Sequence, residues 1–246
     1  MKISKSSPRV DMNNDDNNIP LIPPQGDLRD TVYSAVSVGL SLIPIVGGAA
    51  VELLQFVLQP SLEKRRMEWM KMVSEAIIGL QDKQGVKLEN LINSEGFIDT
   101  VIQATHIAYR NSQDEKREAL KNAVINSGLP RPLEQSLQQM FLSWLDVFTV
   151  WHLRLLQIYQ NPEKWEKEND RHFERIYAGG ADYILESAYP ELKTRRDFYD
   201  QIWRDLFQKG LVNSDSLHGM KTGRGIFDKR TTDLGDKFLG FIVNPN

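Results

Sequence analysis

The sequence contains no cysteine and only four histidines among its 246 residues. Without cysteine the chain cannot form a disulfide scaffold, a thiolate zinc site or a cysteine nucleophile. The histidines, at positions 106, 152, 172 and 218, do not show metal-ligand spacing, and neither a HExxH motif nor a glycine-rich dinucleotide or P-loop motif occurs. We therefore expect a protein that is not an enzyme and that uses no cofactor, metal ion or small-molecule substrate.

A strong excess of charge of either sign is also missing. The chain has 30 Lys and Arg residues against 33 Asp and Glu residues, which gives a net charge of −3. Hydrophobic residues make up 41% and charged residues 26%, and this composition supports a folded core in one or two domains. Such a chain is not a general polyanion binder, although a local basic patch is compatible with it. The lack of cysteine fits a reducing compartment, so we expect a cytoplasmic protein.

The first segment, residues 1–28, is poor in apolar side chains and carries a run of Asn and Asp at 13–18. Such a segment cannot bury enough apolar surface to offset its ordering entropy. The same acidic run stands where a secretory signal peptide would have its apolar core. The sequence therefore predicts a disordered arm and argues against secretion by that route.

The second segment, residues 32–58, is the most apolar part of the chain. It has no charged residue from Val32 to Val51, and Pro44 and Gly47–Gly48 interrupt it. The pattern predicts a helical hairpin with arms at about 29–43 and 48–59, either buried in protein or inserted into a membrane. In the membrane interpretation the inserted residues would be Val36, Leu40, Ile43, Pro44, Val46, Leu54 and Phe56, with lipid headgroups contacting Lys64, Arg65 and Arg66.

Apolar residues at helical spacing then predict a bundle that reaches residue 161. We expect helices after Pro60, at 94–110, at 113–126 and at 132–160, with stops at Gly85, Gly128 and Pro162. The longest carries large aromatic residues at helical spacing, which are typical of a core rather than of a cofactor site. The side chains expected to face inward on the first two helices are Met67, Met70, Val73, Ile77, Leu80, Phe97, Val101, Ala104 and Ala108.

Residues 171–246 follow a polar connector and differ in pattern. They predict an amphipathic helix at 194–209, short strands at Leu211–Val212 and Ile226–Phe227 around a glycine-rich loop, and a closing helix. This order resembles a winged-helix domain, and Leu234–Gly235 and Phe238–Leu239 resemble the final helix of many bacterial winged-helix domains.

The winged-helix resemblance implies contacts through a helix and the wing, with either DNA or a protein. From Glu191 onward there are ten basic and eight acidic residues, a balance of +2, and DNA readers usually have a denser basic face. A protein partner is therefore favoured over nucleic acid. The candidate contact residues are Arg195, Arg196, Arg204, Lys221, Arg224 and Arg230.

The chain as a whole resembles an uncharacterised family of bacterial helical proteins. The phrases IPIVGG, PSLEKRRMEW, EKREALKNAVINS and WHLRLL carry this resemblance, which spans residues 42–156 and implies no particular chemistry.

The sequence thus predicts a mainly α fold: a bundle at 29–161 that includes the apolar hairpin, and a winged-helix-like module at 171–246. The favoured function is that of a non-enzymatic regulatory or assembly protein that binds a protein partner, or a second copy of itself, through this module. Two alternatives stay open: a membrane-inserting, pore-forming-like effector that uses residues 32–58 and is membrane-associated, and a DNA-binding regulator.

Overall fold

The structure is a computed structural model that describes residues 48–245, with side chains described from Leu58 onward. The chain divides into two units between Leu58 and Gln59. Of the first unit only the helical backbone that begins at Gly48 is described. The arm predicted at 1–28 and the first arm of the predicted hairpin therefore lie outside the described residues.

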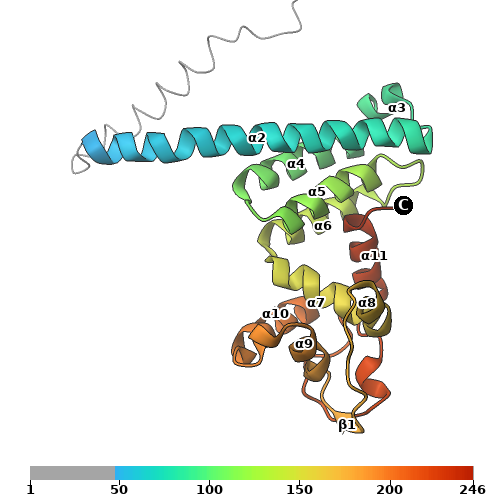
Figure 1. The fold of residues 1–246 in the computed structure, drawn as a ribbon. Helices are drawn as coiled ribbons and strands as arrows, with labels where there is room; N and C mark the ends of the chain where they lie inside the picture. The colour runs from blue at the N-terminus through green and yellow to red at the C-terminus, as the bar shows by residue number, and fades with distance from the viewer. Residues whose placement is uncertain (1–47, 246) are drawn as a thin grey trace, which may run out of the picture. The chain divides into compact units, whose positions relative to one another are not determined.

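Helix α2 runs without a break from Gly48 to Gln84 and contains Pro60 (Figure 1). The sequence predicts separate helices on either side of this proline, and that prediction is wrong. A proline removes one hydrogen bond from a helix and kinks or breaks it, so its presence alone does not require that the helix end. Pro60 is exposed, and the helix continues through it. The helix stops where predicted, at Gly85, whose φ of 63° favours glycine.

The buried face of α2 differs from the predicted one. Met67 and Met70 are exposed, whereas Trp69 is buried and its indole Nε1 donates a hydrogen bond to Thr105 Oγ1 at 2.9 Å. A tryptophan covers more apolar area than a methionine, so the helix turns that side inward. From Leu58 onward, the buried positions on α2 are Trp69, Val73, Ala76 and Leu80.

The next three helices are α3 (Leu88–Ile92), α4 (Glu95–Arg110) and α5 (Asp114–Ser127). The predicted helix at 94–110 is confirmed together with its cap, because Ser94 Oγ accepts a hydrogen bond from the Phe97 amide. The predicted helix at 113–126 is also confirmed, and it ends at Gly128.

The single helix predicted at 132–160 is two helices, α6 (Gln135–Val147) and α7 (Val150–Gln160). Thr149 is extended between them, and its amide donates to His152 Nδ1 at 3.1 Å, which begins α7. Lys116 on α5 ends α6, because its buried ammonium donates to the carbonyl oxygens of Asp146 and Phe148, each at 2.8 Å. A threonine with a polar residue three positions later was the sequence signal for this break.

The polar connector after α7 is also more ordered than expected, since Pro162 begins α8 (Pro162–Glu168). The elements that follow are β1 (Ala178–Gly179), α9 (Asp182–Ala188), the 3-10 helix η1 (Pro190–Leu192), α10 (Arg196–Gln208), β2 (Lys221–Thr222), the 3-10 helix η2 (Gly225–Phe227) and α11 (Asp233–Ile242). The predicted helix at 194–209 is confirmed as α10. The strand predicted at Ile226–Phe227 is wrong, because these residues form η2.

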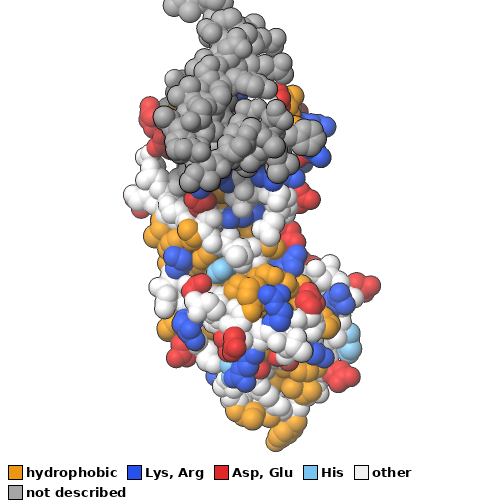
Figure 2. All heavy atoms as spheres, turned by 90° about the vertical axis from the view of Figure 1, so that its left-hand side faces the viewer, with side chains coloured by type: hydrophobic (Ala, Val, Ile, Leu, Met, Phe, Trp, Pro, Cys, Tyr) orange, Lys and Arg blue, Asp and Glu red, His pale blue; other side chains and the backbone are white. Residues whose placement is uncertain are grey.

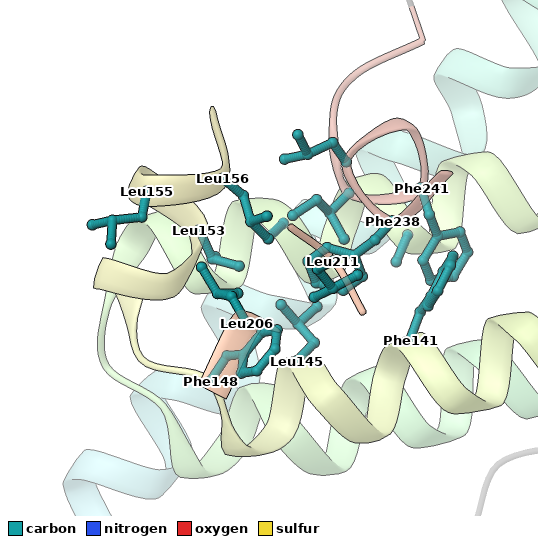
Figure 3. Packing of buried hydrophobic residues seen from close by; sticks show 14 of the residues in the cluster. Phe141, Leu145, Phe148, Leu153, Leu155, Leu156, Leu206, Leu211, Phe238 and Phe241 are labelled. Carbon is teal, nitrogen blue, oxygen red and sulfur yellow. The ribbon is translucent and has the colours of Figure 1, made fainter. Parts of the chain in front are cut away.

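The last helix, α11, packs against helices that lie far from it in the sequence. Phe238 of α11 is buried with ring centroids 5.3 Å from Phe141 and 5.8 Å from Phe148 (Figure 3). Side-chain amides of α5 bind its end: Asn122 donates to the Ile242 carbonyl and Asn126 to the Val243 carbonyl. These contacts place the C-terminal helix in the core of the bundle.

The described residues are therefore mainly helical, as predicted, with one antiparallel two-stranded ladder. Gln59–Asn246 forms one compact unit, and the boundary expected between residues 161 and 171 stays a prediction. Among the helices described in residues 48–245, none combines the length and the apolar character that crossing a membrane requires.

Candidate functional site

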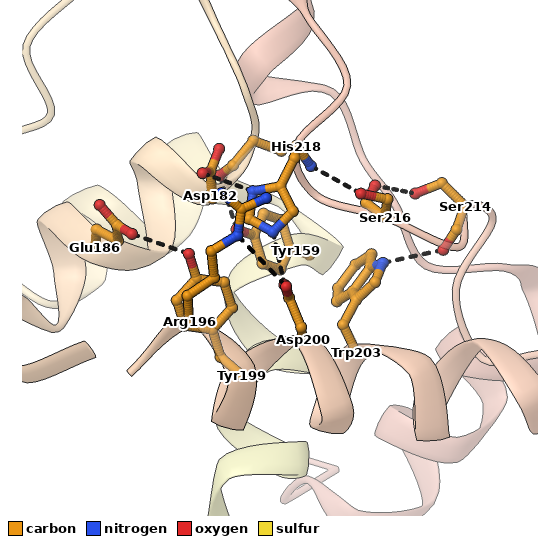
Figure 4. Close-up of polar contacts among 11 residues, drawn as sticks. Tyr159, Asp182, Glu186, Arg196, Tyr199, Asp200, Trp203, Ser214, Ser216 and His218 are labelled. Carbon is orange, nitrogen blue, oxygen red and sulfur yellow. Dashed lines mark hydrogen bonds and ion pairs between the residues drawn. The ribbon is translucent and has the colours of Figure 1, made fainter. Parts of the chain in front are cut away.

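A histidine held between two carboxylates lies at the centre of the C-terminal part. His218 stands in the loop before β2, Asp182 begins α9, and Asp200 lies on α10 (Figure 4). The imidazole Nδ1 is 2.8 Å from Asp182 Oδ2, and Nε2 is 2.6 Å from Asp200 Oδ1. We call these three residues the His218 clamp, because they tie one loop to two helices.

The geometry of the clamp requires a protonated imidazole. An ionised carboxylate only accepts hydrogen bonds, so each ring nitrogen must carry a proton to pair with one. Burial by itself lowers the pKa of His218, but the hydrogen bonds to Asp200 and Asp182 outweigh it, and the pKa is raised above its usual value. With both nitrogens donating, His218 has no lone pair to act as a general base.

The surrounding polar groups are paired as well. The Tyr199 hydroxyl donates to Glu186 Oε1 at 2.9 Å, and burial together with that carboxylate raises the pKa of Tyr199. Arg196 lies 3.6 Å from Asp200. Within residues 48–245, no group of three or more acidic or histidine side chains is arranged to hold a metal ion. The cluster thus has the chemistry of a structural ion-pair network.

This network holds the loop that leads into β2. Trp203 Nε1 donates to the Ser214 carbonyl at 3.0 Å, and the carbonyl of the buried Leu217 accepts from the Ala181 amide at 2.7 Å. The loop is therefore bound to the core up to His218. Two residues after His218 the chain lies at the surface, where Met220 is 78% exposed.

Beside β1 and β2 lies a groove of about 850 Å³. The two most exposed large hydrophobic side chains among the described residues belong to it, Tyr177 at 95% and Met220 at 78%. Figure 2 shows hydrophobic side chains gathered at the lower tip of the molecule, the end at which β1 lies in Figure 1. We call this the groove surface; its lining is Glu163, Arg175, Ile176, Tyr177, Ala178, Met220, Lys221, Thr222, Gly223, Arg224 and Phe227.

The backbone under the groove surface is firmly paired. Ala178 pairs with Thr222 and Gly179 with Lys221 in the antiparallel ladder, and the Gly223 amide donates to the Tyr177 carbonyl at 2.6 Å. A Cβ on Gly223 would lie 2.1 Å from the Ile176 carbonyl oxygen, so only glycine allows this approach. The ladder therefore fixes Tyr177 and Met220 on adjoining segments.

The groove surface brings together two of the six predicted contact residues, Lys221 and Arg224. The three arginines of α10 lie elsewhere and contact groups of that helix or its cap: Arg195 stacks on Phe198 with 4.1 Å from its Cζ to the ring centroid, Arg196 pairs with Asp200, and Arg204 donates to Gln201. None of them belongs to the groove lining with Lys221 and Arg224.

The prediction that Arg230 contacts a partner is wrong. Its side chain is only 6% exposed, its guanidinium donates to the Gly225 carbonyl, and its amide donates to the Tyr159 carbonyl. Arg230 therefore holds the start of η2 in place, and its burial leaves no surface for a partner to contact.

The predicted membrane residues fall mostly outside the described part of the chain. Val36, Leu40, Ile43, Pro44 and Val46 precede it, and for Leu54 and Phe56 only the helical backbone is described. Lys64, Arg65 and Arg66 lie on α2, where Lys64 is 3.8 Å from Glu68.

Sequence reasoning missed the apolar half of the groove surface. Tyr177 reads as part of a short helix, and Met220 lies in a polar loop. The signal available was a large apolar residue close to glycines in both segments, Gly179–Gly180 and Gly219. Glycine favours turns, and a large apolar side chain in a turn has little around it to cover it.

No protein-family model matches this chain, and no significant similarity to curated proteins or to solved structures was found.

Proposed function

We propose that this chain is a non-enzymatic regulatory or assembly protein and that it binds a partner protein through the groove surface. One observation carries the proposal: Tyr177 and Met220, 95% and 78% exposed, line one groove on a backbone that hydrogen bonds hold in place. Exposed apolar side chains gathered at one surface mark interaction sites, and Tyr, Met and Arg are enriched in protein interfaces.

The polar chemistry nearby supports binding over catalysis. His218 is doubly paired, and the Tyr199 hydroxyl is held by Glu186. Neither group is free to exchange protons with a substrate in the groove, and neither belongs to the groove lining. The groove surface itself offers cations and apolar surface, which recognise a partner rather than transform it.

The winged-helix-like interpretation of residues 171–246 belongs to this proposal. In its favour are the order of short helices, the amphipathic α10, the bridge between Val212 and Thr231, and the closing α11. Against it, β2 pairs with β1, which precedes α10, and not with a second strand of a wing. The proposed contact therefore uses the β1–β2 ladder where a winged helix would use its wing.

A photo-crosslinking experiment tests the proposed function. A photoreactive phenylalanine analogue is placed at Tyr177 or Met220 in the full chain, in the organism that makes it, with Ile92 as the matched control. Ile92 is 68% exposed and lies on α3, outside the groove lining.

We expect discrete protein adducts at the two groove positions and none at Ile92. The adduct at Met220 should be lost when Lys221→Glu and Arg224→Glu are introduced together, and kept with Lys193→Glu, an exposed cation outside the lining. Equal adducts at all positions, or adducts that a nuclease removes, would refute the proposal.

A further inference from the structure

Two cations of the groove surface lack an acidic partner. Lys221 and Arg224 are exposed, and within residues 48–245 neither forms an ion pair or a side-chain hydrogen bond. Two other cations of the C-terminal part do have acidic partners, Arg196 with Asp200 and Lys229 with Asp236. Unpaired cations that adjoin one groove favour an anionic partner.

The third cation of the groove, Arg175, is paired and fixed in place. Arg175 donates to Glu166 Oε2 at 2.7 Å, and its guanidinium lies 4.1 Å above the Phe227 ring. Glu163 is the one acidic residue of the lining, against Arg175, Lys221 and Arg224. With Arg175 paired to Glu166, Lys221 and Arg224 against Glu163 still leave the groove with an excess of positive charge, in a chain whose net charge is negative.

Apolar side chains line the same groove as these cations. Tyr177 and Met220 stand at the groove with little cover, and Ile176 and Phe227 are partly buried beneath it. An aromatic or aliphatic side chain of a partner would bury this surface, and a few such anchors together contribute most of the affinity of an interface. The groove therefore suits a partner in which an apolar side chain lies next to carboxylates.

The volume and the rigidity of the groove select the form of the partner. About 850 Å³ lies in the range of ligand sites, roughly 300–1,000 Å³, which holds a few residues of an extended chain. The ladder and the His218 clamp hold both walls before binding, so little ordering is needed on this side.

We infer that the groove surface binds an extended acidic segment of a partner protein, with its carboxylates against Lys221 and Arg224 and an apolar side chain against Tyr177 and Met220. This inference rests on the proposed function and names the class of partner. Single-stranded nucleic acid would use the same cations with base stacking on Tyr177. The peptide is favoured because the arginines of α10 do not extend the basic surface into a path for a phosphate backbone.

Fluorescence anisotropy with labelled peptide pools tests the inference on the full chain. One pool is random over Asp, Glu, Leu and Phe; a second replaces the acidic residues by Lys and Arg; a third replaces the apolar residues by Ser and Gly. A labelled oligo-dT of similar length is the nucleic-acid probe. We expect binding of the first pool, at least about tenfold weaker binding of the third, and none of the second.

Variants locate the binding. Lys221→Glu with Arg224→Glu should weaken the first pool at least about tenfold, and Tyr177→Ser about tenfold, whereas Lys193→Glu should change it less than about twofold. All four substituted positions are exposed, so unchanged circular dichroism is expected to accompany the loss.

Three results would overturn the inference: equal binding of the basic pool, no loss in the double variant, or oligo-dT binding that depends on the same residues. If photo-crosslinks at Tyr177 and Met220 still identify a protein while no acidic pool binds, the inference fails and the proposed function stands.

Discussion

Replacing His218 by alanine would remove the cation that Asp182 and Asp200 share, and its effect follows from the geometry of the clamp. Two charge-assisted hydrogen bonds of 2.8 and 2.6 Å are lost, and the two carboxylates are left without their shared partner. A hydrogen bond to a charged group contributes about 1.5–3 kcal/mol. Side-chain exposures of 19–29% leave these groups partly screened by solvent, so the two bonds together should contribute less than the sum of two such values, about 2 kcal/mol.

We therefore expect His218→Ala to lower the free energy of unfolding by about 2 kcal/mol near pH 6. In a chain of this size each kcal/mol lowers the Tm by about 2–4 °C, so the Tm should fall by about 4–8 °C. The matched control is His106→Ala, since His106 is exposed on α4 and its side chain is outside the clamp.

The sign of the pH dependence is the stricter test. The pKa of His218 is raised in the folded chain, so the stabilisation is complete below its usual value of 6.5. As the pH rises through the folded pKa, the imidazole loses a proton, one nitrogen can no longer donate, and the stabilisation is lost. The difference between the parent chain and His218→Ala should thus be largest in mild acid and shrink in mild base.

Urea unfolding followed by circular dichroism at about pH 6 and about pH 9 measures this difference, and NMR of the imidazole measures the pKa directly. Equal destabilisation at both pH values, or a pKa of His218 at or below 6.5, would refute the reasoning.

Three further predictions test the packing of the core, the β1–β2 ladder and the loss of stability at low pH. Phe238→Ala should cost about 3–5 kcal/mol by urea unfolding because the ring is fully buried against Phe141, while Phe207→Ala, at a 41% exposed position, should cost less than about 1 kcal/mol; similar costs would contradict the packing described. Gly223→Ala should cost about 1–3 kcal/mol, since its Cβ would collide with a backbone carbonyl, and weaken acidic-peptide binding; unchanged affinity would mean that the ladder does not shape the groove. Burial lowers the pKa of His152, although Asp205 opposes it, so the folded state binds fewer protons there and loses stability as the pH falls below about 6.5. The His152→Gln variant should therefore lose less stability on acidification than the parent chain does. Equal losses of stability in the two proteins would contradict this reasoning.

The helices that the sequence predicted well are those with local signals at both ends. The helix at 94–110 has a serine cap and a regular apolar face, and α10 has the same regular face with a glycine after it. The errors occur where a local signal has two outcomes. Pro60 is compatible with a break or with a continuous helix, and the segment around Phe148 reads as one helix until Lys116 from another part of the chain binds the carbonyls there.

The candidate site was less accessible to prediction than the helices. Lys221 and Arg224 were found because charge on a glycine-rich loop is a local feature. Tyr177 was missed, since β1 and β2 are two residues long and too short to show alternation. Arg230 was misassigned, because its burial depends on where Tyr159 and Gly225 lie.

Composition and periodicity alone determined that this chain is mainly helical, that its aromatic residues form a core, and that no common enzyme motif is present, because these properties depend on residue type and on spacing within one or two turns. Only the tertiary structure decided that Phe238 closes the bundle, that His218 joins two helices, and that Tyr177 adjoins Lys221 in one groove. Each of those results depends on pairing segments far apart in the chain, where the entropy of closing the loop is offset only by the packing of the whole unit.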